Sequence, residues 1–244
     1  ENISLYGNLG GTLKNPTVSM SGVGEGISYG GETIAKSEFE ITYSGDEMKV
    51  DLDFSGFGDS GNGKIITRGK IKNILSGDYT LDLMSAMTDL PLSWTNTILD
   101  EKMAKLGGEL DAAITIKGKL SSPALLGGGT LKNALVAIAY LGTEYDVTGG
   151  FGITPDGIEL NGLQVRDGKG GEGFLVGTAL HENFKKWNLD ISLSIENKNA
   201  PLELMNIPRS PDAYFYGTGN AWGDVNIFGY EDQITIEARV KTSQ

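Results

Sequence analysis

Apolar and polar residues alternate along one short segment after another in this chain of 244 residues. Residues 188–196 show the most regular alternation, with Leu189, Ile191, Leu193 and Ile195 at every second position. Successive side chains of a β-strand point to opposite faces, so this pattern predicts a strand with one apolar and one polar face. The sequence therefore predicts sheets that have one apolar side.

Segments of this kind fill most of the chain and predict an all-β fold. We expect about sixteen short strands, most of them joined by connections of only a few residues. Such connections favour antiparallel neighbours, because parallel strands need long crossovers. The 36 glycines fit a chain with many tight turns. A sheet of this many strands must curl, close or stack.

Two stretches depart from the alternation and predict one or two short helices. In residues 90–106 the apolar residues recur at helical spacing, and the stretch stops at Gly107 and Gly108. We expect a short amphipathic helix there, which plugs the open side of a sheet or caps a module. Residues 197–211 are irregular, with one helical turn expected at 202–205. The expected helical stripe consists of Leu92, Ile98, Leu99, Met103 and Leu106.

One strand sequence recurs later in the chain. Residues 219–229 repeat the glycine spacing of residues 108–118, and a Pro-Leu pair precedes each copy, at Pro91 and Pro201. A fixed internal period is typical of repeat architectures. We expect one continuous β-groove fragment, built of modules of about 110 residues. The approximate module bounds are 1–89, 90–198 and a partial 199–244.

Charge and composition narrow the function classes. The net charge of −12 argues against a nucleic-acid partner, because a phosphate backbone requires clusters of lysine and arginine. With no cysteine there is no disulfide and no thiolate metal site. No apolar run reaches the length of a transmembrane helix. Because the repeats at both ends are incomplete, we expect a fragment of a longer protein that carries its targeting and anchoring segments elsewhere.

The motifs that could indicate a nucleotide or metal site have simpler structural interpretations. Residues 168–173 fit the dinucleotide pattern G-x-G-x-x-G, but a strand follows instead of the required helix, so a hairpin turn is expected. The acidic glycine-rich loops 59–63 and 167–171 lack the carboxylates of a calcium site. His181, the only histidine, cannot form a zinc site alone. We therefore predict a protein that is not an enzyme, with no catalytic residue, no metal site and no cofactor.

The order of several motifs resembles the modules of the TamB family of AsmA-like bacterial envelope proteins. The resemblance covers residues 90–244 well and the first 90 residues more loosely. The matching motifs are L-D-A-A-I-T-I-K-G-K-L-S-S-P-A-L (110–125), L-G-T-E-Y (141–145), the turn at Asp167, G-T-A-L-H-E-N-F (177–184) and F-Y-G-T-G-N-A-W-G-D-V-N-I (215–227).

The resemblance implies an elongated, mostly antiparallel sheet in the periplasm, curled into a taco-like hydrophobic groove. It implies an inner-membrane anchor in the full-length protein and an Omp85-type outer-membrane barrel as partner. The implied roles are transport of phospholipids between the inner and outer membranes, with their acyl chains in the groove, and assembly of outer-membrane proteins.

Three functions fit the repeated apolar faces. The first is a lipid conduit, the second a scaffold for outer-membrane protein assembly, and the third a structural adhesin or stalk with a closed core. Periodicity alone does not separate an open groove from a sandwich in which two such faces pack together. The residues expected to line a groove are Ile41, Val50, Leu52, Phe54, Ile114, Ile116, Ile158, Leu160, Leu189, Ile191, Leu193, Ile195, Ile234 and Ile236.

Overall fold

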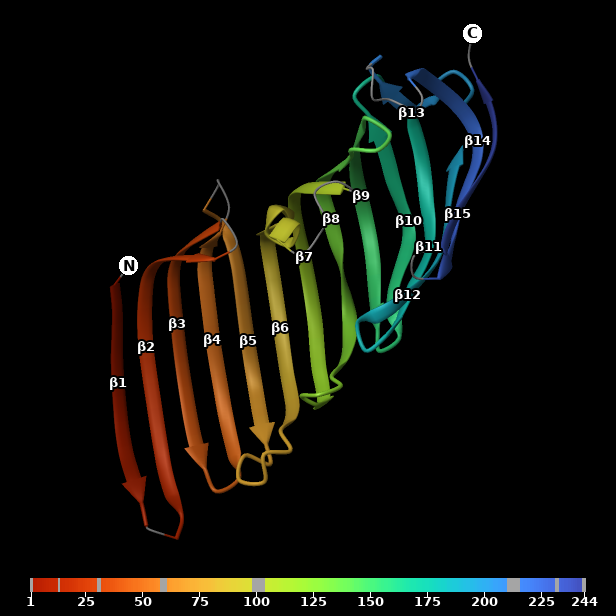
Figure 1. Cartoon of the computed structure of the whole chain (residues 1–244). Helices are drawn as coiled ribbons and strands as arrows, with labels where there is room; N and C mark the ends of the chain where they lie inside the picture. The colour runs from red at the N-terminus through yellow and green to blue at the C-terminus, as the bar shows by residue number, and fades with distance from the viewer. Residues whose placement is uncertain are drawn as a thin grey trace. The chain divides into compact units, whose positions relative to one another are not determined.

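The chain forms one long antiparallel sheet of fifteen strands that is not closed (Figure 1). The computed structural model describes residues 2–12, 14–29, 32–57, 61–97, 104–209, 216–230 and 233–242. Strands follow one another in sequence order from β1 to β12, and β14 then pairs with β12, β13 and β15. The predicted all-β, antiparallel fold class is confirmed.

The strands are separated mostly by tight turns. The first eight are β1 (Asn2–Gly11), β2 (Pro16–Tyr29), β3 (Glu32–Ser44), β4 (Glu47–Phe57), β5 (Gly63–Lys72), β6 (Thr80–Pro91), β7 (Ala104–Lys119) and β8 (Ala124–Ile138). The others are β9 (Thr143–Thr154), β10 (Gly157–Asp167), β11 (Glu172–Glu182), β12 (Lys185–Ile195), β13 (Leu202–Ile207), β14 (Gly217–Tyr230) and β15 (Gln233–Thr242). One 3-10 helix, η1 (Leu92–Thr97), follows β6.

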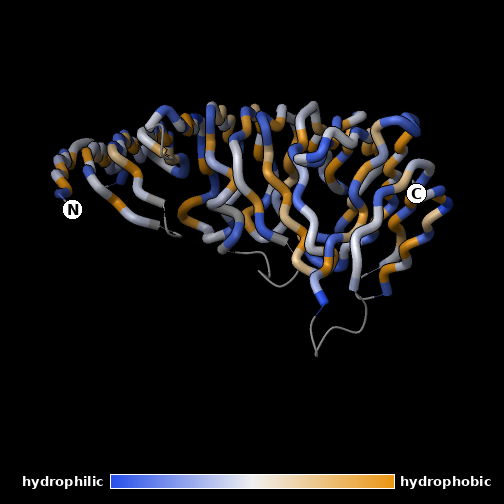
Figure 2. The backbone as a smooth tube through the Cα atoms, turned by 90° about the horizontal axis from the view of Figure 1, so that it is seen from above, coloured by the Kyte–Doolittle hydropathy of each residue, from blue (hydrophilic) through white to orange (hydrophobic). Residues whose placement is uncertain are grey.

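The chain divides into two compact units. Unit 1 contains Glu1–Trp94, Leu110–Gly129 and Ile153–Pro155. Unit 2 contains Thr95–Glu109, Thr130–Gly152 and Asp156–Gln244. Figure 2 shows hydrophilic and hydrophobic residues alternating along the strands.

The strand register of unit 1 defines one apolar face. Ile41 of β3 lies opposite Val50 of β4, and Phe54 of β4 lies opposite Ile65 of β5. Ile65 in turn lies opposite Met87 of β6. Residues directly opposite each other in an antiparallel pair project to the same side of the sheet. These five side chains therefore share a face, which we call the apolar face of unit 1.

The other side of unit 1 is polar and carries ion pairs between neighbouring strands. These pairs are partly exposed to solvent, so each contributes little to stability. They keep this side of the sheet hydrated and distinguish it from the apolar face. The pairs are Lys64–Asp53 at 3.0 Å, Arg68–Asp51 at 2.9 Å and Lys70–Glu47 at 2.9 Å.

Unit 1 has a small buried core at one end of its strands. Ile34, Phe57, Ile65 and Leu90 form this cluster, and Phe57 is almost completely buried. Ile34 belongs to the β2–β3 hairpin, whose end bends toward β4 and β5 in Figure 1. Gly26 has a φ of 66°, a left-handed conformation that suits glycine and permits such a bend. The hairpin end thus covers one end of the apolar face.

Unit 2 has an apolar face of the same kind. Gly177 of β11 lies opposite Leu160 of β10 and Ile191 of β12. Ile191 lies opposite Ile227 of β14, which lies opposite Ile236 of β15. The row crosses five strands without a polar side chain, so it defines the apolar face of unit 2.

β13 forms where the sequence predicted a helical turn at 202–205, so that prediction is wrong. Ile195 at the end of β12 lies opposite Gly223 of β14, and Leu202 of β13 lies opposite Ala221. β13 therefore continues β12 along the same side of β14. Leu202 is completely buried there. Burial and pairing with β14 outweigh the local irregularity of the sequence.

The amphipathic helix predicted over residues 90–106 is not found in the described part of this range. β6 extends to Pro91, η1 is a 3-10 helix, and β7 begins at Ala104. The Asn96 side chain donates to the Leu106 carbonyl at 2.7 Å and accepts from the Leu106 amide at 2.8 Å. The Asn96 side chain thus makes the two hydrogen bonds that the backbone of a neighbouring strand would make. These bonds explain why Leu106 is extended. Ile98, Leu99 and Met103 of the expected stripe lie outside the described residues.

The repeated sequences occupy corresponding places. The copy at 108–118 lies in β7 and the copy at 219–229 lies in β14. Each Pro-Leu lead-in supplies a buried leucine, Leu92 in the first copy and Leu202 in the second. In both copies the lead-in runs beside the beginning of the repeated strand, as η1 in one case and β13 in the other.

Candidate functional site

The lining residues predicted in unit 1 lie on its apolar face. Ile41, Val50, Leu52 and Phe54 alternate on β3 and β4 and share this side by register. Ile114 and Ile116 lie on β7. The ammonium group of the next residue, Lys117, lies 3.8 Å from the Asp82 carboxylate on the polar side. Since Lys117 points to the polar side, its neighbour Ile116 and Ile114 point to the apolar one. The structure thus brings all six together on one side of unit 1.

The lining residues predicted in unit 2 also share one face. A bulge between Asn161 and Leu163 shifts the register of β10, so Leu163 joins the same side as Leu160. Sequence alternation alone did not identify Leu163, because the bulge breaks the period of two. The predicted residues on this face are Ile158, Leu160, Leu189, Ile191, Leu193, Ile195, Ile234 and Ile236.

Exposure varies along the apolar face of unit 2. Ile195, next to β13, is 1% exposed, whereas Leu189, Ile191 and Leu193 are half-buried. Ile236 on the edge strand β15 is 63% exposed. Within the described ranges all strands belong to one sheet, so no second sheet packs on this face. The face is closed at the β13 end and open to solvent toward β15.

Glycine and aromatic residues shape the apolar face of unit 1. A Cβ atom built on Gly22 of β2 would come within 2.5 Å of the Phe39 ring and 2.8 Å of Leu5. The Phe39 ring therefore lies over Gly22 on the neighbouring strand. At its β1 edge the face has a shallow hollow of about 340 Å³, lined by Leu5, Leu9, Val18 and Met20 among others. The hollow is apolar and open to solvent.

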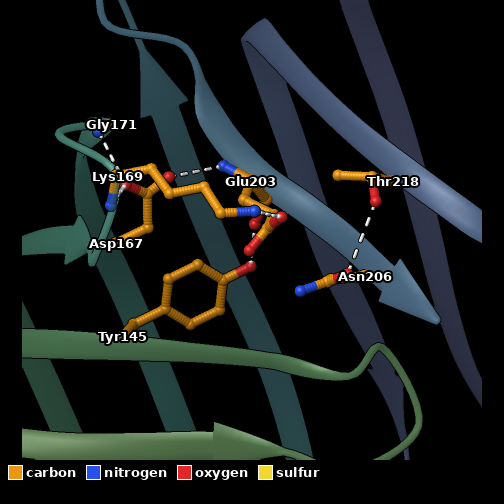
Figure 3. A network of polar contacts seen from close by, with 7 residues as sticks. All are labelled: Tyr145, Asp167, Lys169, Gly171, Glu203, Asn206 and Thr218. Carbon is orange, nitrogen blue, oxygen red and sulfur yellow. Dashed lines mark hydrogen bonds and ion pairs between the residues drawn. The ribbon is translucent and has the colours of Figure 1, made fainter. Parts of the chain in front are cut away.

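A buried polar network holds the covered end of unit 2 (Figure 3). Asp167, at the end of β10, is 7% exposed. Its Oδ1 accepts hydrogen bonds from the amides of Lys169 at 2.8 Å and Gly171 at 2.7 Å. Its Oδ2 accepts the amide of Glu203 in β13 at 2.7 Å. One carboxylate thus organises the β10–β11 turn and fastens β13 to it.

Tyr145 and Lys169 complete this network. The Tyr145 hydroxyl donates to the Glu203 carbonyl at 2.7 Å, and the Lys169 ammonium pairs with the Glu203 carboxylate. The sequence predicted only a turn at 167–171, and the structure adds its connection to β13. The signal was local, an aspartate at the first position of a glycine-rich turn, but its partner Glu203 lies 36 residues away.

Burial of Tyr145 gives the network a dependence on alkaline pH. Desolvation, with the nearby carboxylates of Asp167 and Glu203, raises the pKa of the Tyr145 phenol above its ordinary value of 10.0. Because the folded pKa is the higher one, this contribution to stability is complete below about pH 10 and is lost as the pH rises through the folded pKa.

We expect Tyr145→Phe to make unfolding less sensitive to pH above about pH 10. The variant also loses the hydrogen bond to Glu203, which costs about 1 kcal/mol at neutral pH. Urea unfolding monitored by circular dichroism at several pH values measures both effects. Tyr230→Phe, at an exposed position, is the control for the loss of a hydroxyl group and should leave the stability at neutral pH unchanged. An unchanged alkaline slope in Tyr145→Phe would contradict this role.

The glycine-rich motif at residues 168–173 forms a turn and the beginning of β11. Residues 168–171 form the turn between β10 and β11, as predicted for the glycine-rich motif. In the part of the chain that the structure describes, no group of acidic residues and histidine is arranged to hold a metal ion. Residues 59 and 60 of the other acidic loop lie outside the described residues.

Comparisons with known proteins give no assignment. No family model matches the chain, and no curated protein or solved structure matches it. Among the described residues, no helix is long and apolar enough to span a membrane. Function is therefore inferred from the residues of this chain.

Proposed function

We propose that this chain binds phospholipid acyl chains on its apolar faces and carries them between the inner and outer membranes of a diderm bacterium. The observation that supports this most strongly is the uncovered apolar face of unit 2, where Leu189, Ile191 and Leu193 remain half-buried and Ile236 is exposed. Water is a poor solvent for such a surface, and a hydrocarbon chain is a suitable cover for it.

The energetics favour acyl chains as the ligand. Removing an acyl chain of about sixteen methylenes from water contributes on the order of 12 kcal/mol, at roughly 0.8 kcal/mol for each methylene. The row from Leu160 through Ile191 to Ile236 offers no hydrogen-bonding side chain. Such a surface holds a hydrocarbon without fixing it at one position, which permits movement from strand to strand.

The resemblance to TamB modules supplies the cellular setting of the proposal. We propose from it that the chain lies in the periplasm, in a full-length protein anchored in the inner membrane. An Omp85-type outer-membrane barrel is the proposed partner of that full-length protein. The net charge of −12 agrees with a surface that stays in water while lipid covers only the apolar faces.

A second candidate function is a scaffold for the assembly of outer-membrane proteins. The observation in its favour is β1, which pairs with β2 on one side and with no other described strand. Its ten residues contain no charge and no proline, and all are exposed. Natural edge strands are usually protected from further pairing by charged residues or proline. β1 has neither, so its edge can accept an added strand by β-augmentation. This function predicts crosslinks from β1 to polypeptide and little dependence on the apolar faces.

Lipid mass spectrometry of the purified protein tests the proposed function. We expect phospholipids to co-purify with the chain when it is expressed with a signal peptide in the periplasm of a diderm host. Delipidated protein should recover them from vesicles. A protein that is folded by circular dichroism but carries no lipid under either condition would contradict the proposal.

A further inference from the structure

The β11–β12 hairpin has an unusual turn at its tip. Glu182 and Lys185 are the last paired residues, and Asn183 and Phe184 between them have φ angles of 51° and 60°. Two central residues with positive φ are typical of a type I′ turn, whose second central position normally holds glycine. Here that position holds Phe184.

Lys186 adds a second departure from the usual turn residues. Its φ is 52°, next to the register shift between Leu180 and Glu182. Bulky residues rarely adopt this left-handed conformation. Glycine is abundant in this chain, with 36 residues, and Gly45 occupies such a position in the β3–β4 turn with a φ of 66°. A strained backbone retained at one turn indicates that the side chains there have a function.

The side chains of the tip form an exposed aromatic cluster. The His181 ring lies 4.4 Å from the Phe184 ring and 4.9 Å from the Trp187 ring, measured between centroids. The His181 Nδ1 accepts the Phe184 amide at 3.2 Å. Phe184 is 43% exposed and Trp187 is 37% exposed. The cluster therefore has a defined geometry but does not belong to a core.

Two lysines lie between Phe184 and Trp187. Lys186 forms an ion pair with Glu182 at 2.9 Å, and Lys185 follows the turn directly. The tip, residues 181–187, thus contains two lysines and one glutamate, whereas the chain as a whole carries a net charge of −12. An anionic surface would repel most of the protein and attract this hairpin, so the charge distribution favours one orientation on such a surface.

We propose that the β11–β12 tip docks on the headgroup region of anionic phospholipid membranes. Phe184 and Trp187 insert among the headgroups, where amphipathic aromatic rings are favoured, and Lys185 and Lys186 contact lipid phosphates. A hairpin tip with exposed rings fits an interface. This inference goes beyond lipid carriage, because docking does not require the apolar faces.

Sedimentation with mixed phosphatidylglycerol–phosphatidylcholine vesicles tests the proposal on the intact chain. We expect wild-type protein to bind these vesicles and to bind pure phosphatidylcholine vesicles much more weakly. In a Trp94→Phe, Trp222→Phe background, Trp187 emission should shift to shorter wavelength on binding. No binding to the mixed vesicles, or no shift of Trp187, overturns the proposal.

Phe184→Gly separates docking from a structural role. Glycine relieves the left-handed strain, so the variant should unfold at a higher urea concentration than wild type. It should nevertheless bind the mixed vesicles about tenfold more weakly. Tyr140→Ser removes an exposed aromatic residue elsewhere in unit 2 and is the matched control, with binding expected to be unchanged. Equal binding by Phe184→Gly and wild type overturns the proposal.

Ile191→Arg distinguishes this proposal from lipid carriage. It changes the apolar face and leaves the tip intact, so vesicle docking should persist while lipid uptake is lost. Docking that disappears in Ile191→Arg but persists in Phe184→Gly would assign membrane binding to the apolar face and overturn the role of the tip. Capture of a protein partner by the tip, without vesicle binding, would overturn it as well.

Discussion

Ile191→Arg is expected to abolish most lipid binding while leaving the sheet folded. Ile191 lies in the middle of β12, opposite Gly177 on one side and Ile227 on the other. A guanidinium at this point would lie under any acyl chain that crosses the row. Covering a charge with hydrocarbon costs several kcal/mol, which is a large part of the gain from burying the chain.

The arginine itself can be accommodated because the site is only half-buried and Gly177 leaves space beside it. We expect at least a tenfold loss of co-purifying phospholipid, since a penalty of about 1.4 kcal/mol already gives that factor. Mass spectrometry of lipid extracted from equal amounts of folded protein provides the measurement.

Asn188→Arg is the matched control for this experiment. It introduces the same charge in the same strand, but Asn188 is exposed and lies on the other side of the sheet from Ile191, paired with Leu180 and Tyr230. Its lipid content should equal that of wild type. If both variants retained lipid, or both lost it equally, the apolar face would not be the binding surface.

Asp167→Ala is expected to cause the largest loss of stability at a polar position in unit 2. The substitution leaves the buried amides of Gly171 and Glu203, and the partly buried amide of Lys169, without their acceptor. Each unsatisfied buried donor costs about 1–3 kcal/mol, so the two buried amides predict a loss of at least about 2 kcal/mol. Urea unfolding measures this loss as a lower midpoint with an unchanged slope.

Two controls define the origin of that effect. Asp167→Asn retains one carbonyl acceptor and should lose less stability than the alanine variant. Asp156→Ala changes an aspartate in the exposed β9–β10 turn and should stay within about 0.5 kcal/mol of wild type. A midpoint for Asp167→Ala equal to that of wild type would show that the carboxylate does not fasten β13.

The period of two in the sequence was sufficient to predict the fold class and many strands. Residues 188–196 were expected to form a strand and correspond to β12, because burial of one face fixes the alternation. The shared face of Leu189, Ile191 and Leu193 follows from the same period. These features depend only on neighbouring positions, which a sequence displays directly.

Features that depend on distant partners could not be predicted. Leu202 lies in a segment without regular alternation of apolar and polar residues. It becomes a strand residue because Ala221 of β14 pairs with it. Leu106 fits a helical stripe but is extended because Asn96 binds its backbone. Leu163 joins the apolar face through a bulge, a change of register that a regular period does not contain.

Photo-crosslinking at paired positions tests lipid binding by the apolar faces most directly. A photoreactive amino acid is placed at Ile41 or Ile236 on the apolar faces, and at the adjacent Thr42 or Thr235 on the other side of the sheet. The proposal predicts phospholipid adducts at Ile41 and Ile236 and few at Thr42 and Thr235. Equal adducts at adjacent positions, or adducts to polypeptide alone at Ile41 and Ile236, would contradict it.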